Sequence, residues 1–446
     1  MAGNQISITR WLILVVVFGA FVLRLVVAGS YKSRFSPGEV VSQPASESKY
    51  LRKAYIEIGD SQQYLELAKN LRSNFFFSWD GATPVTFRTP GYPIFLALIN
   101  NDPVLLVVIQ SLLGALTVLF LFFIGELWFG RESGIFAAIL MAFDLPAIAH
   151  TGMVMSETLF VFLLVLCIWL FSVAEIKPTG FFLFSVCGAL LGLTALTRPV
   201  ALFAPLLLLI VLLVRRHWKA LGVFSLGFVL LCGSWMGRNY YHYHRPNFSS
   251  IGGYNFFFYN AAALIADRDG LQFEEAREKL ERNYAAKLTG DNPLDLADQL
   301  MRMATRIICS DPLRYAKVYL QGLLKIITGI KSDEIVFRVT GTNFRLATFK
   351  SFVAMPNLPL MTRVVVVALA LVELLVTVGA VVFSFIAMIK RRDMPAVFLT
   401  IVGWYFLLAA APLPDGRFKI PAMPFFYLVS GDLFFRKKTH REVNKD

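Results

Sequence analysis

The sequence predicts an all-α polytopic membrane protein with two large extracytoplasmic loops that bear interfacial amphipathic helices. Three observations predict this class: 57% of the 446 residues are hydrophobic, the mean hydropathy is +0.61, and several apolar runs are long enough to cross a bilayer. This much apolar surface exceeds what a soluble domain can bury. We therefore expect residues 1–446 to form a single transmembrane domain.

Apolar length predicts about ten transmembrane helices. The first run, Trp11 to Ala28, is longer than a signal-peptide core and has no small-residue cleavage site, so we expect it to remain as an anchor. Residues 180–214 are either one tilted helix or two, and Arg198-Pro199 near their middle favours two. The predicted spans are 10–29, 103–125, 134–152, 157–175, 180–196, 199–214, 219–236, 362–389, 395–411 and 421–435.

Basic residues on alternate connections predict the orientation. By the positive-inside rule their shared side is the cytoplasm, which places both termini and a basic tail at 436–446 there, in a plasma-membrane protein. The opposite face then receives loops at 30–102 and 237–361. This distribution also explains the net charge of +13, so nucleic-acid binding is not expected. The basic residues predicted to lie together on the cytoplasmic side are Arg131, Lys177 and residues 215–219, 390–392 and 436–438.

The second loop contains two segments of different character. Residues 248–266 are aromatic and small, which suits a segment at the membrane interface. Residues 271–288 place apolar side chains on one face among many charges, so we expect an amphipathic helix lying on the membrane or on the protein. Its apolar face consists of Phe273, Ala276, Leu280, Tyr284 and Leu288.

The first loop is the part of the chain richest in chemically usable groups, and Asp60 is its sharpest candidate. The run Asp60-Ser61-Gln62-Gln63 fits a helix N-cap with Gln at the third helical position, which alone would explain the acid. An acid held at the membrane surface beside an apolar wall is equally suited to act as a general base. The two roles are compatible, and the sequence leaves both open.

Two more candidates stand at the ends of predicted spans. Arg88 precedes the rigid turn Thr89-Pro90-Gly91-Tyr92-Pro93, which predicts a fixed depth for its guanidinium, on a substrate or on lipid head groups. Glu157 follows Ser156 at the extracytoplasmic end of a span. A carboxylate there is costly unless it is paired or functional, although a plain helix start is an equal account.

Further cations recur at predicted extracytoplasmic helix ends, where topology does not require them. Together with Arg88 they are suited to bind a phosphate, because guanidinium groups match phosphate oxygens. Singly, each is more often bound to lipid head groups. The chain has no Walker loop, Rossmann glycine pattern, nucleophile elbow or His/Cys metal spacing. The cations at predicted extracytoplasmic helix ends, apart from Arg88, are Arg198, Arg238, Arg417 and Lys419.

Several motifs resemble one family in their order and spacing. The chain resembles bacterial GT-C membrane glycosyltransferases of the family 39 or dolichyl-phosphate-mannose-protein mannosyltransferase-like group. Relatives of this group include the aminoarabinose transferases acting on lipid A. The resemblance covers most of residues 10–430, and its first-loop signature is the most specific part. The motifs are GDSQQYLELAKNL, FRTPGYPIFLALI, MSETLF, LTRPVAL, WMGRNYY with SIGGYNFF, and DGRFKIPAMP.

The resemblance implies an inverting transferase that uses a polyprenyl-phosphate-linked sugar and acts on a lipid, glycan or protein acceptor at the extracytoplasmic face. By position, Asp60 matches the family's first-loop acid, Glu157 the acid near the fourth span, and Arg417 the basic residue of the last signature. Protein mannosyltransferases carry Asp-Glu where this chain has Asp60-Ser61, which weakens a protein acceptor.

The residues suggest a division of labour for such a reaction. Asp60 would deprotonate the acceptor, and Arg88, Arg198, Arg238, Arg417 and Lys419 would hold the donor phosphate. No cofactor is required and a divalent metal ion is optional. The chief alternative is a membrane transporter or lipid flippase without transfer activity, which should place ionisable residues at the bilayer midplane.

Overall fold

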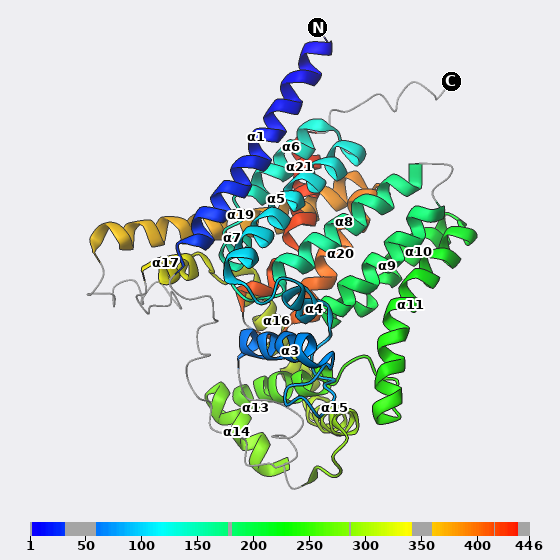
Figure 1. Cartoon of the computed structure of the whole chain (residues 1–446). Coiled ribbons are helices and arrows are strands. Elements are labelled where there is room, and N and C mark those ends of the chain that lie inside the picture. Colours follow the sequence, from blue (N-terminus) through cyan, green and yellow to red (C-terminus); the bar gives the residue numbers. More distant parts are fainter. Residues whose placement is uncertain are drawn as a thin grey trace.

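The computed structural model describes residues 2–31, 59–176, 181–284, 287–340, 359–413 and 415–435. Within these ranges the regular structure is helical, apart from one isolated bridge between Ser78 and Pro84. Figure 1 shows a bundle of long helices above a layer of shorter helices. The predicted all-α class is confirmed. Parts of both predicted loops, Lys177 and the basic tail 436–446 lie outside the described residues.

Each predicted apolar run forms a helix or a helix pair. Among the described residues, five helices are long and apolar enough to cross a membrane, and a bent pair makes up to six. The five are α1 (Ala2–Gly29), α5 (Pro103–Trp128), α8 (Glu157–Ile176), α11 (Trp218–Tyr243) and α19 (Leu360–Arg391). The bent pair is α6 (Arg131–Ala142) with α7 (Leu145–Thr151).

Four shorter apolar segments occupy the other four predicted spans. They are α9 (Phe181–Thr197), the 3-10 turn η1 (Pro199–Phe203) with α10 (Pro205–Val214), α20 (Met394–Ala410) and α21 (Met423–Phe435). The polytopic membrane architecture is therefore confirmed, while length and composition establish five or six of the ten expected spans. The break at Arg198-Pro199 falls where the sequence predicts it.

The single span predicted at 134–152 is wrong in one respect, because α6 and α7 meet at a bend of 52°. Asp144 caps α7 by accepting a hydrogen bond from a backbone N–H of its first turn. Arg24 on α1 is 1% exposed and donates to the carbonyl oxygens of Met141 and Ala142, at 2.8 and 3.0 Å. Side chains thus satisfy the backbone groups that the bend leaves free.

Helices α9 and α11 pack with their backbones in direct contact. A Cβ atom added at Gly188 would lie 2.0 Å from the carbonyl oxygen of Phe224, and one at Gly227 would lie 2.3 Å from that of Ser185. Glycine at both positions lets the helices approach this closely, as small residues do between membrane helices.

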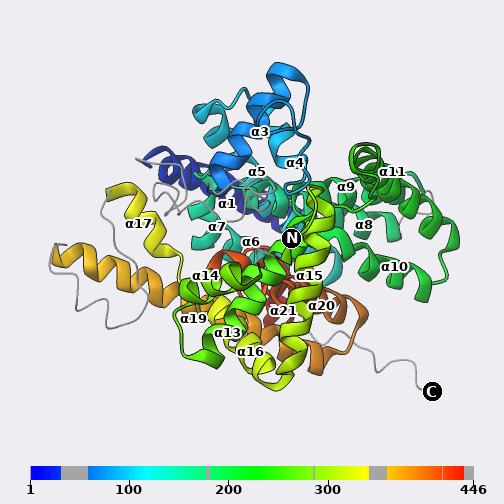
Figure 2. The same cartoon turned by 90° about the horizontal axis from the view of Figure 1, so that it is seen from below.

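The lower layer contains most of the described parts of both predicted loops, while α17 (Ser332–Thr340) of the second loop lies beside α19 (Figures 1 and 2). The loops contact each other where the backbone N–H of Ser250 donates to the carbonyl oxygen of Thr86 at 3.0 Å. The expected amphipathic helix is confirmed as α14 (Phe273–Tyr284), with Ala276 and Leu280 buried. The first loop supplies α3 (Asp60–Asn74) and α4 (Gly91–Leu98). The second supplies α12 (Ile251–Asn255), the π-helical turn η2 (Phe256–Ala261), α13 (Ala262–Asp269), α14, α15 (Pro293–Ser310), α16 (Pro312–Thr328) and α17 (Ser332–Thr340).

Candidate active site

Asp60 is the first residue of α3 and forms ion pairs there. The residue before it, Gly59, occupies the N-cap position, and no side chain caps the helix. The Asp60 carboxylate instead pairs with Arg88 through one oxygen and with Arg417 through the other, the latter at 3.1 Å. The expectation that Asp60 is the N-cap is therefore wrong, because two charge-assisted bonds hold its carboxylate.

Arg88 is held on three sides. Its Nε donates to Gln63 Oε1 at 2.7 Å, which engages the amide that a capping box would use. Its guanidinium carbon lies 5.1 Å from the ring centroids of both Tyr64 and Phe87. The Arg88 side chain is 11% exposed. These contacts fix the Arg88 guanidinium in place, where it pairs with Asp60, a partner that the sequence does not predict.

Glu157 and Arg198 form a second ion pair. Glu157 begins α8, and its Oε1 lies 2.5 Å from Arg198 Nη1. The Glu157 side chain is 1% exposed and that of Arg198 is 19% exposed. The hydroxyl of Ser156 lies 3.4 Å from both Arg198 Nη1 and the Tyr64 hydroxyl, and so connects this pair to α3.

Arg417 stands in the 3-10 turn η4 (Gly416–Lys419), which Asp415 caps by accepting from the Arg417 backbone N–H at 2.9 Å. Burial raises the pKa of Asp60, but the charges of Arg88 and Arg417 outweigh burial and hold it well below its usual range. Burial lowers the pKa of Arg417, whereas Asp60 and Asp415 raise it by more. Arg417 also lies in the electrostatic field of Glu157.

The structure therefore brings five of the predicted site residues together. They come from α3, the turn before α4, the start of α8, the turn after α9, and η4. Three guanidinium groups stand against two carboxylates, so the cluster favours an anionic ligand over a cation. The five residues are Asp60, Arg88, Glu157, Arg198 and Arg417.

Arg238 and Lys419 are the two predicted site residues whose bonds lead elsewhere. Arg238 donates to the carbonyl oxygens of Val85 at 2.7 Å and Phe77 at 3.2 Å, and so fastens the first loop to α11. Lys419 is 1% exposed and pairs with Glu373 of α19 at 2.8 Å. For both, the assignment to the donor phosphate stays a prediction, and in this structure each cation is bonded to a partner within the protein.

Sequence reasoning missed Glu373 and Arg24, both of which lie inside predicted spans. An ionisable residue within an apolar run is a signal that could have found them, because such a residue is costly unless it is paired. Their presence also weakens the argument that this chain keeps ionisable residues at helix ends. Their bonds, however, go to the protein's own groups.

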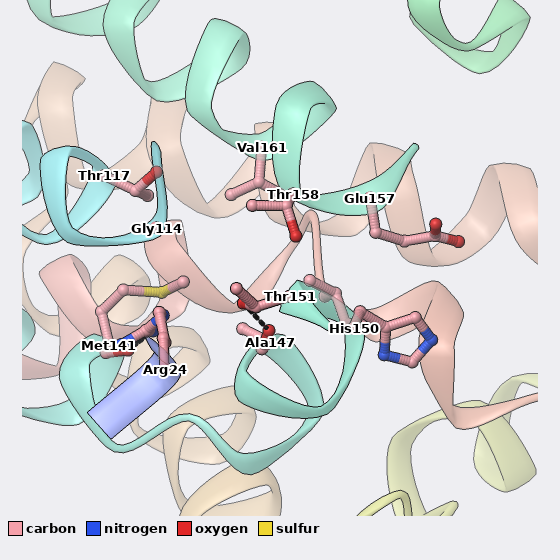
Figure 3. A pocket seen from close by; sticks show the side chains of 11 residues that line it. Arg24, Gly114, Thr117, Met141, Ala147, His150, Thr151, Glu157, Thr158 and Val161 are labelled. Carbon is pink, nitrogen blue, oxygen red and sulfur yellow. Dashed lines mark hydrogen bonds between the residues drawn. The ribbon is translucent and has the colours of Figure 1, made fainter. Parts of the chain in front are cut away.

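A buried pocket lies on the bundle side of Glu157. Figure 3 shows Glu157 and His150 on one side of it and Arg24 on the other. His150 Nδ1 lies 2.9 Å from the carbonyl oxygen of Pro146, an acceptor, so Nδ1 carries the proton. His150 interacts electrostatically with the Glu157 carboxylate, in addition to Arg198. Among the described residues, no group of three or more His, Cys, Asp or Glu side chains is placed to hold a metal ion.

Residues 92–234 match the sequence profile of the family described as dolichyl-phosphate-mannose-protein mannosyltransferase. The expected resemblance is thus confirmed over this segment, which contains Glu157 and Arg198, whereas Asp60, Arg88 and Arg417 lie outside it. A search of curated proteins finds no match.

Two solved structures superpose on most of this chain, at low sequence identity. The archaeal oligosaccharyltransferase AglB from Archaeoglobus fulgidus, in complex with an inhibitory peptide and a dolichol-phosphate, superposes with a TM-score of 0.47 at 12% identity. That superposition covers 95% of this chain and 50% of AglB, so the chain spans half the length of that protein. ArnT from Cupriavidus metallidurans bound to undecaprenyl phosphate gives a TM-score of 0.42 at 13% identity, over 95% of this chain and 77% of ArnT.

Proposed function

We propose that this protein transfers a sugar from a polyprenyl-phosphate-linked donor to a lipid, glycan or protein acceptor at the extracytoplasmic face of the plasma membrane, with inversion at the anomeric carbon. The observation that carries the proposal is the convergence of Asp60, Arg88 and Arg417 beside the Glu157–Arg198 pair. The family matched over residues 92–234 is named for a dolichyl-phosphate-linked mannose, which supports a lipid-phosphate donor.

The proposed reaction is a single displacement. The acceptor hydroxyl or amine loses its proton to the Asp60 carboxylate as its oxygen or nitrogen forms a bond to the anomeric carbon. The bond from that carbon to the phosphate oxygen breaks on the opposite face, and the electron pair leaves with the phosphate. Arg88, Arg198 and Arg417 stabilise the charge that the leaving phosphate gains.

The ion pairs of Asp60 fit a general base that becomes active when the donor substrate binds and takes over its arginine partners. While Arg88 and Arg417 both hold the carboxylate, its low pKa makes it a weak base. A donor phosphate competes for the same two guanidinium groups, because both are suited to bidentate phosphate binding. Donor binding would then raise the pKa of Asp60 and prepare it for the acceptor proton. A metal ion remains optional in this scheme, since guanidinium groups can neutralise the phosphate.

The test is a transfer assay with Asp60→Asn. Purified protein in lipid vesicles is incubated with a labelled undecaprenyl-phosphate sugar, and the release of lipid phosphate and of transferred sugar is measured. The variant should fold normally and lose transfer. Glu66→Gln, which removes an acid further along α3, is the matched control and should retain activity. A fully active Asp60→Asn protein would refute the base assignment.

The same assay distinguishes the alternative function. A transporter or flippase would move the labelled lipid across the vesicle membrane without cleaving the bond between sugar and phosphate. We do not favour this outcome, because the cluster concentrates an acid and phosphate-binding cations at one end of the bundle rather than along a path through it. A screen of donor lipids with different sugars then identifies the substrate.

A further inference from the structure

A buried carboxylate near the middle of α19 collects bonds from two other segments. The Glu373 side chain is 1% exposed. It accepts from the Lys419 ammonium group at 2.8 Å and from the backbone N–H groups of Lys331 and Ser332 at 2.8 to 3.0 Å. Lys419 also donates to the carbonyl oxygen of Gly329 at 2.6 Å. Glu373 therefore joins α19 to η4 and to the start of α17.

These bonds continue to the candidate active site. The Lys331 ammonium group pairs with Asp415 at 2.9 Å, and Asp415 accepts from the Arg417 backbone N–H at 2.9 Å. Arg417 in turn pairs with Asp60 at 3.1 Å. Ion pairs and backbone hydrogen bonds thus connect Glu373 to the proposed base.

The backbone segments around these bonds are packed so closely that they have little room to shift. A Cβ atom added at Gly416 would lie 2.7 Å from the carbonyl oxygen of Gly329, and one at Gly322 would lie 2.6 Å from Pro412 Cα. The connection between α16 and α17 therefore contacts η4 directly. A displacement of residues 329–332 must displace the turn that carries Arg417.

We propose that Glu373 is a positioning residue that fixes the place of Arg417 in the active site. Two links transmit its effect: Lys419 on the same turn as Arg417, and Lys331 through Asp415. When Glu373 loses its charge, Lys419 is left as a buried cation without its counter-charge and must move toward water or other acceptors. The turn η4 moves with it. The proposal rests on the proposed function only where the ligand is a lipid phosphate.

The first experiment measures the position of residue 417 without any ligand. Arg417→Cys is placed in a Cys309→Ser background, since Cys309 is exposed and the other three cysteines are buried. Its reaction rate with a charged methanethiosulfonate is compared with and without Glu373→Gln. We expect the rate to change by about tenfold.

The matched control is Asp432→Asn. Asp432 is also fully buried and pairs with Arg391 at the C-terminal end of α19, away from η4. It should change the rate at residue 417 by less than about twofold. Lys331→Met is a second test variant, because it keeps the backbone bonds to Glu373 and removes only the ion pair with Asp415. Rates that change no more with Glu373→Gln and Lys331→Met than with Asp432→Asn would overturn the proposal.

The second experiment measures binding of undecaprenyl phosphate, with undecaprenol as the control that lacks the phosphate. Arg417→Ala and Glu373→Gln should each weaken binding by about tenfold, and the double variant should be little weaker than Arg417→Ala alone. Losses that multiply would show that Glu373 acts independently of Arg417 and refute the positioning role. Unchanged binding in Arg417→Ala would refute the phosphate assignment instead, while the reaction rates at residue 417 still decide the positioning role.

Discussion

Replacing Arg198 with alanine should destabilise the protein more than replacing Glu157 with glutamine. The two partners of this ion pair differ in burial, since the Glu157 side chain is 1% exposed and the Arg198 side chain is 19% exposed. Arg198→Ala leaves a buried carboxylate without the cation that lies 2.5 Å away. Glu157→Gln leaves a guanidinium that still reaches solvent and lies 5.8 Å from the Phe160 ring centroid.

The difference in burial between Glu157 and Arg198 determines how much the two variants should differ in stability. Removing one partner of a buried ion pair costs about 3–5 kcal/mol when the other charge is left buried. We expect Arg198→Ala to lie near the lower end, at about 3 kcal/mol, because Arg417 still contributes to the field at Glu157. Glu157→Gln keeps the shape of the side chain and should cost about 1–2 kcal/mol. The double variant should recover part of the loss, since no buried charge remains.

The assay is equilibrium unfolding of the purified protein in mixed detergent micelles, followed by the signal of its tryptophans. Free energies of unfolding are compared for the parent, both single variants and the double variant. A Glu157→Gln protein that is less stable than Arg198→Ala would refute the reasoning. A double variant whose loss equals the sum of the two single losses would also refute it, because the two residues would then act independently.

Two further predictions concern pH and helix packing. Because Arg88 and Arg417 hold the pKa of Asp60 below its usual range, kcat/KM should stay constant as pH falls toward about 4. Arg88→Gln should raise that pKa and move the acid limb of the profile to higher pH, and identical midpoints would contradict the assignment. Gly227→Ala should cost about 1–3 kcal/mol in the same unfolding assay, because its Cβ would lie 2.3 Å from a carbonyl oxygen of α9. A Cβ atom added at Gly222 of α11 would have nothing within 4 Å, so Gly222→Ala should change stability by less than about 1 kcal/mol. Equal losses of stability for Gly227→Ala and Gly222→Ala would exclude close packing as the cause.

The membrane class and much of the candidate site follow from the sequence for a physical reason. Apolar length alone identifies a segment that suits a bilayer, and a cation at a helix end away from the cytoplasm needs an explanation other than topology. Arg198 and Arg417 are both predicted on this ground. The structure pairs each of them with an acid that the sequence also singles out, Glu157 and Asp60.

The partners of Lys419 and Arg238 depend on how the helices pack, which cannot be read from a single sequence. Each residue along an α-helix turns the side chain by about 100°, so the neighbours that Glu373 meets depend on the rotation of α19 within the bundle. The pairing of Lys419 with Glu373 could therefore not be predicted from the sequence. Likewise, Arg238 finds carbonyl acceptors on the first loop only because α11 extends to Tyr243 and reaches it.

The buried guanidinium of α1 has a consequence for biosynthesis. Besides the Ala20 carbonyl on its own helix, Arg24 has two acceptors that lie 117 and 118 residues further along the chain, at Met141 and Ala142. At about 5–20 residues per second, the ribosome supplies them on the order of ten seconds after Arg24. Until then α1 carries a charge that is costly in the lipid core. The bonds that bury the Arg24 guanidinium against α6 therefore form only with a segment that has not yet been made when the first helix leaves the ribosome.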